Sequence, residues 1–155
     1  MEKYVIYQSQ FGPIEIRYKE DKVTYIKKDI TEKSKNEAEC PCKLTDEVIK
    51  QFEEYFQGKR KMFDFKYDLQ GTDFQKKVWH ALEQIPYGET RSYKDIATAI
   101  GNAKASRAVG MANNRNPITI AVPCHRVIGS SGKLVGYAGG LEMKEKVLEL
   151  ESKNK

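Results

Sequence analysis

A chain of 155 residues is long enough for one ordinary domain or for two small ones. Hydrophobic residues make up 39% and charged residues 32%, and the net charge is +5, a composition typical of folded proteins. No apolar run approaches the ~20 residues of a membrane span, and residues 1–20 contain charged residues throughout. These features exclude membrane proteins, signal peptides, collagens and disulfide miniproteins. We therefore expect a soluble, cytoplasmic protein.

The first third of the chain favours β-structure. Three short segments rich in β-branched and aromatic residues, at 4–7, 14–18 and 23–27, are separated by turn signals and predict an antiparallel sheet. A charged linker over about 29–43 follows. Thr45 then opens a helix that Gly58 ends. The pattern changes near 68–71, so we predict two domains, 1–70 and 71–155.

The three cysteines argue against a disulfide framework, because their number is odd and no secretion signal precedes them. Cys40 and Cys42 lie in the polar linker, where we expect two exposed loop thiols. Zinc usually takes four ligands at recognisable spacings, and the chain has only two histidines, His80 and His125. We therefore predict no metal site.

From residue 72 the pattern is helical. Thr72 and Gln75 fit a capping box, and Pro86-Tyr87-Gly88 ends the first helix. Ser92 starts a second helix, and a third is predicted over about 104–114, with Ala105, Ala108, Val109 and Ala112 facing inward. Two short helices joined by a turn that contains glycine form the outline of a helix-turn-helix.

The positive charge of the chain falls on this same region. Between residues 91 and 126 there are six Lys and Arg residues, and Asp95 is the one acidic residue. The net charge of this segment is therefore +5, which equals the net charge of the whole chain. A basic block in an otherwise balanced protein favours a surface that binds a polyanion. The alternative is a solvated helix pair that happens to be basic.

The last part of the chain combines a buried run, a glycine-rich loop and a helix. The apolar residues 118–122 predict a buried extended segment, 129–140 contain five glycines, and 141–150 predict a closing helix. Cys124 and His125 stand between the first two. A thiol with a pKa of ~8.5 needs a base or a positive field to become a nucleophile. His125 could supply the base and Arg126 the field; the alternative is a structural Cys beside a surface His.

The amino-acid sequence of this segment resembles that of the O6-alkylguanine-DNA alkyltransferase family. The resemblance rests on Pro-Cys-His-Arg-Val-Ile at 123–128, on Tyr-Ala-Gly-Gly-Leu at 137–141, and upstream on 86–93 and 106–110. It covers about 71–151 in almost unbroken register. It implies an α+β fold, with a small N-terminal antiparallel-sheet (RNase H-like) domain and a mostly helical C-terminal domain that holds a winged-helix-like helix-turn-helix.

The resemblance also implies roles for single residues. Cys124 matches the alkyl acceptor, His125 the base that acts through a water, Glu151 the carboxylate that orients His125, and Tyr93 a phenol donor to the guanine. Arg107 matches the residue that enters the base stack when the nucleotide is flipped out. The other implied DNA-binding residues are Ser92, Tyr93, Lys104, Ala105 and Arg115. The implied pocket and hinge residues are Asn116, Pro123, Val127, Tyr137 and Ala138, and many family members carry Ser where Ala138 stands.

The implied function is direct repair of O6-alkylguanine, and of O4-alkylthymine, in double-stranded DNA. The alkyl group would pass irreversibly and stoichiometrically to Cys124, without a cofactor and in a monomer. Two competing hypotheses remain open at this stage: a sensor that grips alkylated DNA without repairing it, and a cysteine hydrolase that uses Cys124 and His125 over many turnovers.

Overall fold

A computed structural model describes residues 1–28, 35–132, 137 and 140–155 of the chain. The chain divides into two compact units, Met1–Leu69 and Gln70–Lys155. Within the described residues, no helix combines the length and apolar character that crossing a membrane requires.

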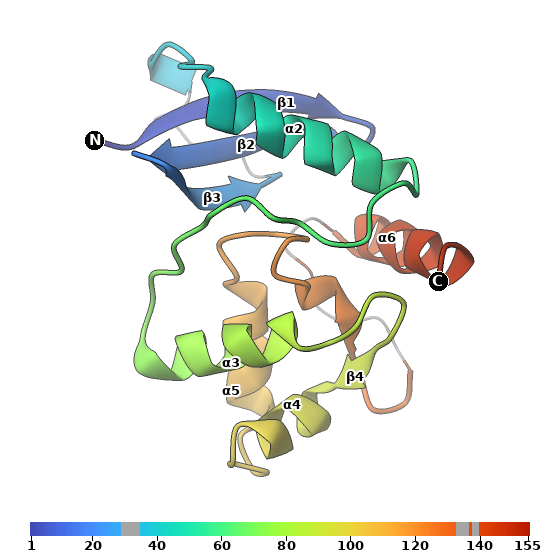
Figure 1. Cartoon of the computed structure of the whole chain (residues 1–155). Coiled ribbons are helices and arrows are strands. Elements are labelled where there is room, and N and C mark those ends of the chain that lie inside the picture. The colour runs from blue at the N-terminus through green and yellow to red at the C-terminus, as the bar shows by residue number, and fades with distance from the viewer. Residues whose placement is uncertain (29–34, 133–136, 138–139) are drawn as a thin grey trace. The chain divides into compact units, whose positions relative to one another are not determined.

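The first unit contains a three-stranded antiparallel sheet in the order β1-β2-β3 (Figure 1). The strands are β1 (Lys3–Ser9), β2 (Gly12–Lys19) and β3 (Lys22–Lys27). Ile16 of the central strand pairs with Val5 on one side and Ile26 on the other, and all three side chains are buried. Alternation of apolar and polar residues places this set on one face. The predicted sheet is thus confirmed.

Helix α2 (Lys43–Phe56) crosses this sheet (Figure 1), and the rings of Phe52 and Tyr7 meet edge to face at 6.5 Å. The prediction that Thr45 opens the helix was wrong, because the helix begins two residues earlier. Cys42 is its N-terminal flanking residue, and the Cys42 N–H donates to Thr45 Oγ1 at 2.8 Å. Cys40 and Cys42 are half-buried rather than exposed, since the Cys40 N–H donates to the Tyr4 carbonyl of the sheet and the Cys42 carbonyl accepts from the Asp46 N–H in the helix.

The second unit is built on three helices, α3 (Asp73–Glu83), α4 (Tyr93–Ala99) and α5 (Ser106–Asn114). Both predicted N-terminal caps are present. Thr72 Oγ1 accepts from the Gln75 N–H at 3.1 Å, and Ser92 Oγ accepts from the Asp95 N–H at 3.0 Å. The core lies between α3 and α5, where Trp79 Nε1 donates to the Ala112 carbonyl at 2.9 Å.

Two predictions about the third helix were wrong. It begins at Ser106 rather than near 104, with Ala105 as its N-terminal flanking residue. Ala108 is exposed and Ala105 is only half-buried, whereas Val109 and Ala112 are buried as predicted. The small side chains predicted that all four alanine and valine positions are buried. In the structure, the apolar face of α5 that packs against α3 is narrower than this prediction and contains only Val109 and Ala112 of the four.

The segment 118–122 is buried, as predicted, but it is not extended. The Val122 N–H donates to the Ile118 carbonyl at 3.1 Å and the Ala121 N–H to the Thr119 carbonyl at 2.9 Å, which makes a tight turn. Ile120 has a φ of +73°, which is costly for a β-branched residue. After this turn come a 3-10 helix (Cys124–Arg126) and β5 (Val127–Ile128), which pairs in parallel with β4 (Arg91–Ser92).

Helix α6 (Leu141–Lys153) closes the unit and contacts the 3-10 helix. Met143 and Val147 are buried as predicted, whereas Leu150 is half-buried. A sheet-plus-helix unit followed by a mostly helical unit confirms the predicted α+β class.

Candidate active site and DNA interface

The thiol of Cys124 is buried at the start of the 3-10 helix. Cys124 is 3% exposed, and its backbone N–H donates to the Val122 carbonyl at 2.8 Å. Pro123 precedes it and Val127 follows the 3-10 helix; both are buried. The turn over 118–122 and strand β5 therefore hold the candidate nucleophile from both sides.

His125 and Glu151 form a buried pair next to this thiol. His125 Nε2 lies 2.8 Å from Glu151 Oε2, and neither side chain is more than 1% exposed. An ionised carboxylate only accepts hydrogen bonds, so Nε2 carries the proton and Nδ1 has a bare lone pair. Nδ1 has no hydrogen-bond partner among the described residues. The pair is therefore arranged so that Nδ1 can accept a proton.

Arg126 completes this cluster from inside the protein. Its Nε and one terminal nitrogen donate to the two oxygens of Glu151, both at 2.9 Å, and the other terminal nitrogen donates to the Ile85 carbonyl at 2.7 Å. The backbone N–H of Gly88 faces Glu151 Oε1 at 3.5 Å. The sequence analysis included Arg126 in the predicted basic surface. This was wrong, because the charge of Arg126 is buried and paired with Glu151.

The electrostatics of the cluster keep His125 neutral and Glu151 ionised. Burial lowers the pKa of His125, and this outweighs the opposing effect of Glu151. Burial raises the pKa of Glu151, but hydrogen bonds from His125 and Arg126 outweigh it and hold that pKa well below the usual range. A neutral imidazole beside a fixed carboxylate is the form that a general base requires.

Two phenols lie near the thiol. Tyr93 is the first residue of α4, and its pKa is raised by burial and by negative charge on Cys124. The pKa of Tyr137 is raised well above its usual value by burial and by negative charge on Cys124 and Glu151. Both phenols therefore remain protonated donors at neutral pH. Ala138, the other predicted residue of this loop, lies outside the described residues.

Lys144 on α6 is a fully buried cation that the sequence analysis missed. Its Nζ donates to the Val127 carbonyl at 2.6 Å. Burial lowers its pKa from 10.5 to about 8, while negative charge on Cys124 opposes this shift. A lysine one residue from the buried Met143 in an amphipathic pattern usually points to solvent, so the sequence carried no signal for it.

We expect Lys144→Met to abolish a rise in stability at alkaline pH. A base whose pKa is depressed from 10.5 to about 8 binds fewer protons folded than unfolded, so the free energy of unfolding rises between these values. Between pH 8 and pH 10 the rise is expected to reach about 2 kcal/mol, and urea unfolding at these two pH values measures it. Lys146→Met, which removes an exposed lysine of the same helix, is the control and should keep the rise. Parallel curves for Lys144→Met and the wild type would contradict this prediction.

Two buried asparagines connect α5 with the nucleophile segment. Asn116 Nδ2 donates to the Val122 carbonyl at 2.7 Å, and its Oδ1 accepts from the Ile118 N–H at 3.0 Å, so Asn116 closes the turn over 118–122. Asn113, which the sequence analysis did not single out, donates from Nδ2 to the Cys124 carbonyl at 3.3 Å.

The exposed cations gather on α4, on α5 and on the turn between them. Arg107 stands in the first turn of α5 and Arg115 just after its end, and Lys104 lies in the preceding turn. Ser92 and Ala105 flank the starts of the two helices. A cavity of about 630 Å³ opens among these elements. Its lining residues are Tyr93, Lys94, Ser106, Arg107, Gly110, Asn114, Gly129 and Ser130.

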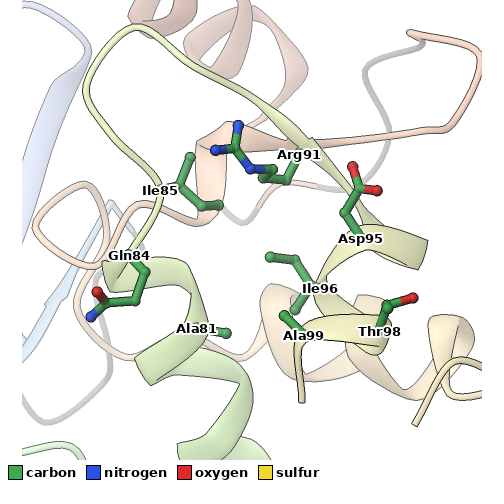
Figure 2. Close-up of a pocket in the computed structure, with 8 residues that line it drawn as sticks. All are labelled: Ala81, Gln84, Ile85, Arg91, Asp95, Ile96, Thr98 and Ala99. Atoms are coloured by element: carbon green, nitrogen blue, oxygen red, sulfur yellow. The ribbon is translucent and has the colours of Figure 1, made fainter. Parts of the chain in front are cut away.

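A second cavity, of about 580 Å³, lies between the end of α3 and α4 (Figure 2). Ile85, in the segment after α3, and Ile96 of α4 line it together with Arg91 and Asp95 (Figure 2). None of the predicted site residues lines it. The described part of the chain also has no group of three or more His, Cys, Asp or Glu residues that could hold a metal ion.

Comparison with known proteins identifies the family of both units. Residues 73–153 match the family model for the 6-O-methylguanine DNA methyltransferase DNA binding domain, and residues 3–69 match the ribonuclease-like domain of the same enzyme. A methylated-DNA–protein-cysteine methyltransferase of Methanosarcina acetivorans is 52% identical over 154 residues, which cover 96% of this chain and 97% of that protein.

Solved structures agree with this result. The crystal structure of the Mycobacterium tuberculosis O6-methylguanine methyltransferase has a TM-score of 0.90 and 44% identity, and covers 100% of this chain and 95% of that chain. The Mycobacterium tuberculosis OGT structure in complex with DNA has a TM-score of 0.91 and 45% identity, and covers 98% and 94%. The chain therefore belongs to the O6-methylguanine DNA methyltransferase family.

Proposed function

We propose that this chain repairs O6-alkylated guanine in double-stranded DNA by transferring the alkyl group to Cys124. The observation that carries the proposal is the buried cluster in which Glu151 accepts from His125 Nε2 at 2.8 Å, so that Nδ1 is left as a base on the residue that follows Cys124. Membership of the methyltransferase family supports the same reaction.

The groups of this cluster and Tyr93 account for every proton transfer in the proposed reaction. His125 Nδ1 takes the proton of the Cys124 thiol through a water, and Glu151 stabilises the imidazolium that forms. The thiolate attacks the alkyl carbon, a C–S bond forms, and the bond between that carbon and O6 breaks. The departing guanine takes a proton from Tyr93, whose raised pKa keeps it protonated until then. The proton on His125 replaces the one that Tyr93 gave up.

The reaction ends with one alkyl group on each chain. The product is a thioether, from which the Cys124 thiolate leaves poorly, and none of His125, Glu151 and Arg126 would restore the thiol. The protein is therefore consumed in a single turnover and needs no cofactor. The chain would act as a monomer in the cytoplasm, where the thiols of all three cysteines stay reduced.

The target base must leave the duplex before it reaches a buried thiol. Exposed cations around α5 would hold the phosphates, and the proposed contacts are Ser92, Lys104, Ala105 and Arg115. Arg107 would fill the space that the base vacates, because it is exposed and lines the cavity beside Tyr93. O4-alkylthymine would enter by the same route.

A labelling experiment tests the proposal. Duplex DNA with O6-[³H-methyl]guanine is incubated in excess over the protein, and peptide mapping locates the label. We expect one methyl group per chain, on the peptide that contains Cys124, and no second turnover. Tight binding with an unchanged substrate would instead indicate a damage sensor. Repeated turnover of an ester substrate without DNA would indicate a hydrolase.

We expect Arg107→Ala to slow repair of duplex DNA about tenfold or more and to leave the reaction with free O6-benzylguanine nearly unchanged. The free base needs no flipping, whereas the duplex loses the side chain that replaces the extruded base. Arg60→Ala, which removes the same charge from the first unit, is the control. The rate constants of both substrates are compared in single-turnover assays. Equal losses on the two substrates would count against a flipping role.

A further inference from the structure

Met111 of α5 is a large apolar side chain that faces solvent. It is 58% exposed, whereas Val109 and Ala112 of the same helix face the core. The other large apolar side chains that are exposed, among the described residues, are Met1, Met62 and Leu141. A single exposed apolar residue needs no explanation by itself. What gives Met111 a meaning is the helix face around it.

This face of α5 carries a positive charge at each end and no carboxylate. Arg107 lies one turn before Met111 and Arg115 one turn after it, and both are exposed. Helix α5 itself contains no Asp or Glu. Between the two cations, the exposed residues of the helix are Ala108, Met111 and Asn114. The face therefore complements a surface that is anionic at its edges and apolar between them.

Another surface helix of the same unit differs from α5 in this respect. The exposed residues of α6 include Glu142, Glu145, Lys146 and Glu149, and Lys146 Nζ lies 3.1 Å from Glu142 Oε1. Charges of both signs on one helix face are typical of a face that stays in water. The middle of the α5 face lacks them, so this face is suited to a partner that removes water from Met111.

Met111 lies next to the candidate substrate cavity. Arg107, Gly110 and Asn114 line that cavity and form the neighbouring row of the same helix. Four residues of an α-helix span about 6 Å, so Met111 is displaced by about this distance along α5 from Arg107. Because Arg107 is proposed to fill the space of the extruded base, Met111 would meet the base pairs and sugars beside that gap.

Opened duplex DNA offers the surface that this face complements. The phosphates at the rims of a groove are anionic, and the sugar rings that form its walls are apolar. Extrusion of a nucleotide also exposes the faces of the neighbouring bases to water. Proteins that kink DNA press Met, Leu or Phe side chains against base steps. The thioether of methionine is flexible and makes favourable contacts with aromatic rings.

We propose that Met111 is a wedge that holds the duplex open: its side chain packs against the base step beside the extruded nucleotide, while Arg107 fills the gap and Arg115 holds a phosphate. The inference rests on the proposed function, because it requires that a nucleotide leaves the duplex at this helix. It assigns the apolar middle of the α5 face to the opening of the duplex and the cations at its ends to affinity.

The test compares three substrates in single-turnover assays at saturating protein. They are O6-methylguanine in a fully paired duplex, the same lesion flanked by mismatched pairs, and free O6-benzylguanine. We expect Met111→Ala to slow the paired duplex about tenfold, the effect of leaving half of a methionine side chain in water. The mismatched duplex should slow less than about twofold, because its nucleotide is extruded in most complexes without the wedge. The free base should react at the wild-type rate.

Three further variants separate the wedge from other effects. Met111→Leu keeps an apolar side chain of similar size and should react within about twofold of the wild type. Met62→Ala, which removes a 78% exposed methionine of the first unit, is the matched control and should react as the wild type does. Arg115→Ala should reduce the slope of log K against log salt by about 1, whereas Met111→Ala should leave it unchanged, because Met111 neutralises no phosphate.

Several results would overturn the inference. Equal slowing of the two duplexes by Met111→Ala would mean that Met111 does not act on opening, and equal slowing of all three substrates would indicate a damaged active site. A lower sedimentation coefficient of free Met111→Ala protein, with unchanged transfer, would assign the face to a second copy of the chain.

Failure of the proposed function would look different, because the wild type would then transfer no methyl group from either duplex. If the wild type alkylates Cys124 and Met111→Ala repairs the paired duplex at the same rate, the function stands and only the role of Met111 is refuted.

Discussion

Cys124→Ser is expected to lower methyl transfer by at least about 10⁴-fold, because the reaction depends on a thiolate that serine cannot replace. A serine hydroxyl is far less acidic than a thiol, and His125 is a weak base in its buried site because burial lowers its pKa. Substitution at an alkyl carbon also favours a polarisable sulfur over an oxygen. Quenched-flow measurement of the methyl group transferred from duplex DNA gives the rate constant.

The same variant should bind DNA as the wild type does. The substitution changes one buried atom and leaves Arg107 and the other exposed cations of α5 in place. The dissociation constant for a duplex that contains O6-methylguanine should therefore change less than about threefold. Cys40→Ser, in the first unit, is the matched control and should retain full transfer. Transfer by Cys124→Ser at a rate near that of the wild type would show that another residue accepts the alkyl group.

Local signals in the sequence predicted the parts of the fold that short-range contacts determine. The helix starts at Thr72 and Ser92 were correct, because each cap joins residues three apart through side-chain and backbone hydrogen bonds. The start of α2 was wrong, because Thr45 was taken as the cap although it lies inside the first turn. The residue that flanks the helix is Cys42, which carries a thiol, whereas hydroxyl side chains such as that of Thr45 are the preferred caps, so the sequence favoured the wrong position.

Long-range packing decided the parts that the sequence did not predict. Arg126, Lys144 and Asn113 are polar residues whose partners come from distant segments: Glu151 and Ile85, Val127, and Cys124. Nothing in the local pattern distinguishes them from surface residues. His125 and Glu151 were paired through the family resemblance, since 26 residues separate them and no helical or strand periodicity connects them.

The structure also divides the positive charge of the second unit into a buried part and an exposed part. The sequence counted Arg126 among six basic residues between 91 and 126. Arg126 faces inward and neutralises Glu151, so the basic surface consists of residues such as Lys94, Lys104, Arg107 and Arg115, which are exposed. The excess charge of this segment thus serves two purposes: most of it faces solvent around the cavity, and one cation stabilises the ionised form of the orienting carboxylate.

Glu151→Gln is expected to lower the rate of transfer about 100-fold. The amide oxygen of glutamine still accepts from His125 Nε2, but it carries no charge to stabilise the imidazolium that forms when the thiol ionises. The rate should fall across pH 6 to 9, because His125 becomes a weaker base at every pH in this range. Glu142→Gln, at an exposed position of the same helix, is the control and should react as the wild type does.

The same substitution should lower the free energy of unfolding by about 3 kcal/mol at neutral pH, because it leaves Arg126 buried without its anion. The sign of the pH dependence follows from the lowered pKa of Glu151: its stabilising effect is complete above the unfolded value of 4.5 and is lost as the pH falls toward the lower folded value. Urea unfolding at pH 7 and pH 3 should therefore show a larger difference between the two proteins at pH 7. An equal difference at both pH values would mean that the charge of Glu151 does not stabilise the fold, and an unchanged rate of transfer would remove Glu151 from the proposed mechanism.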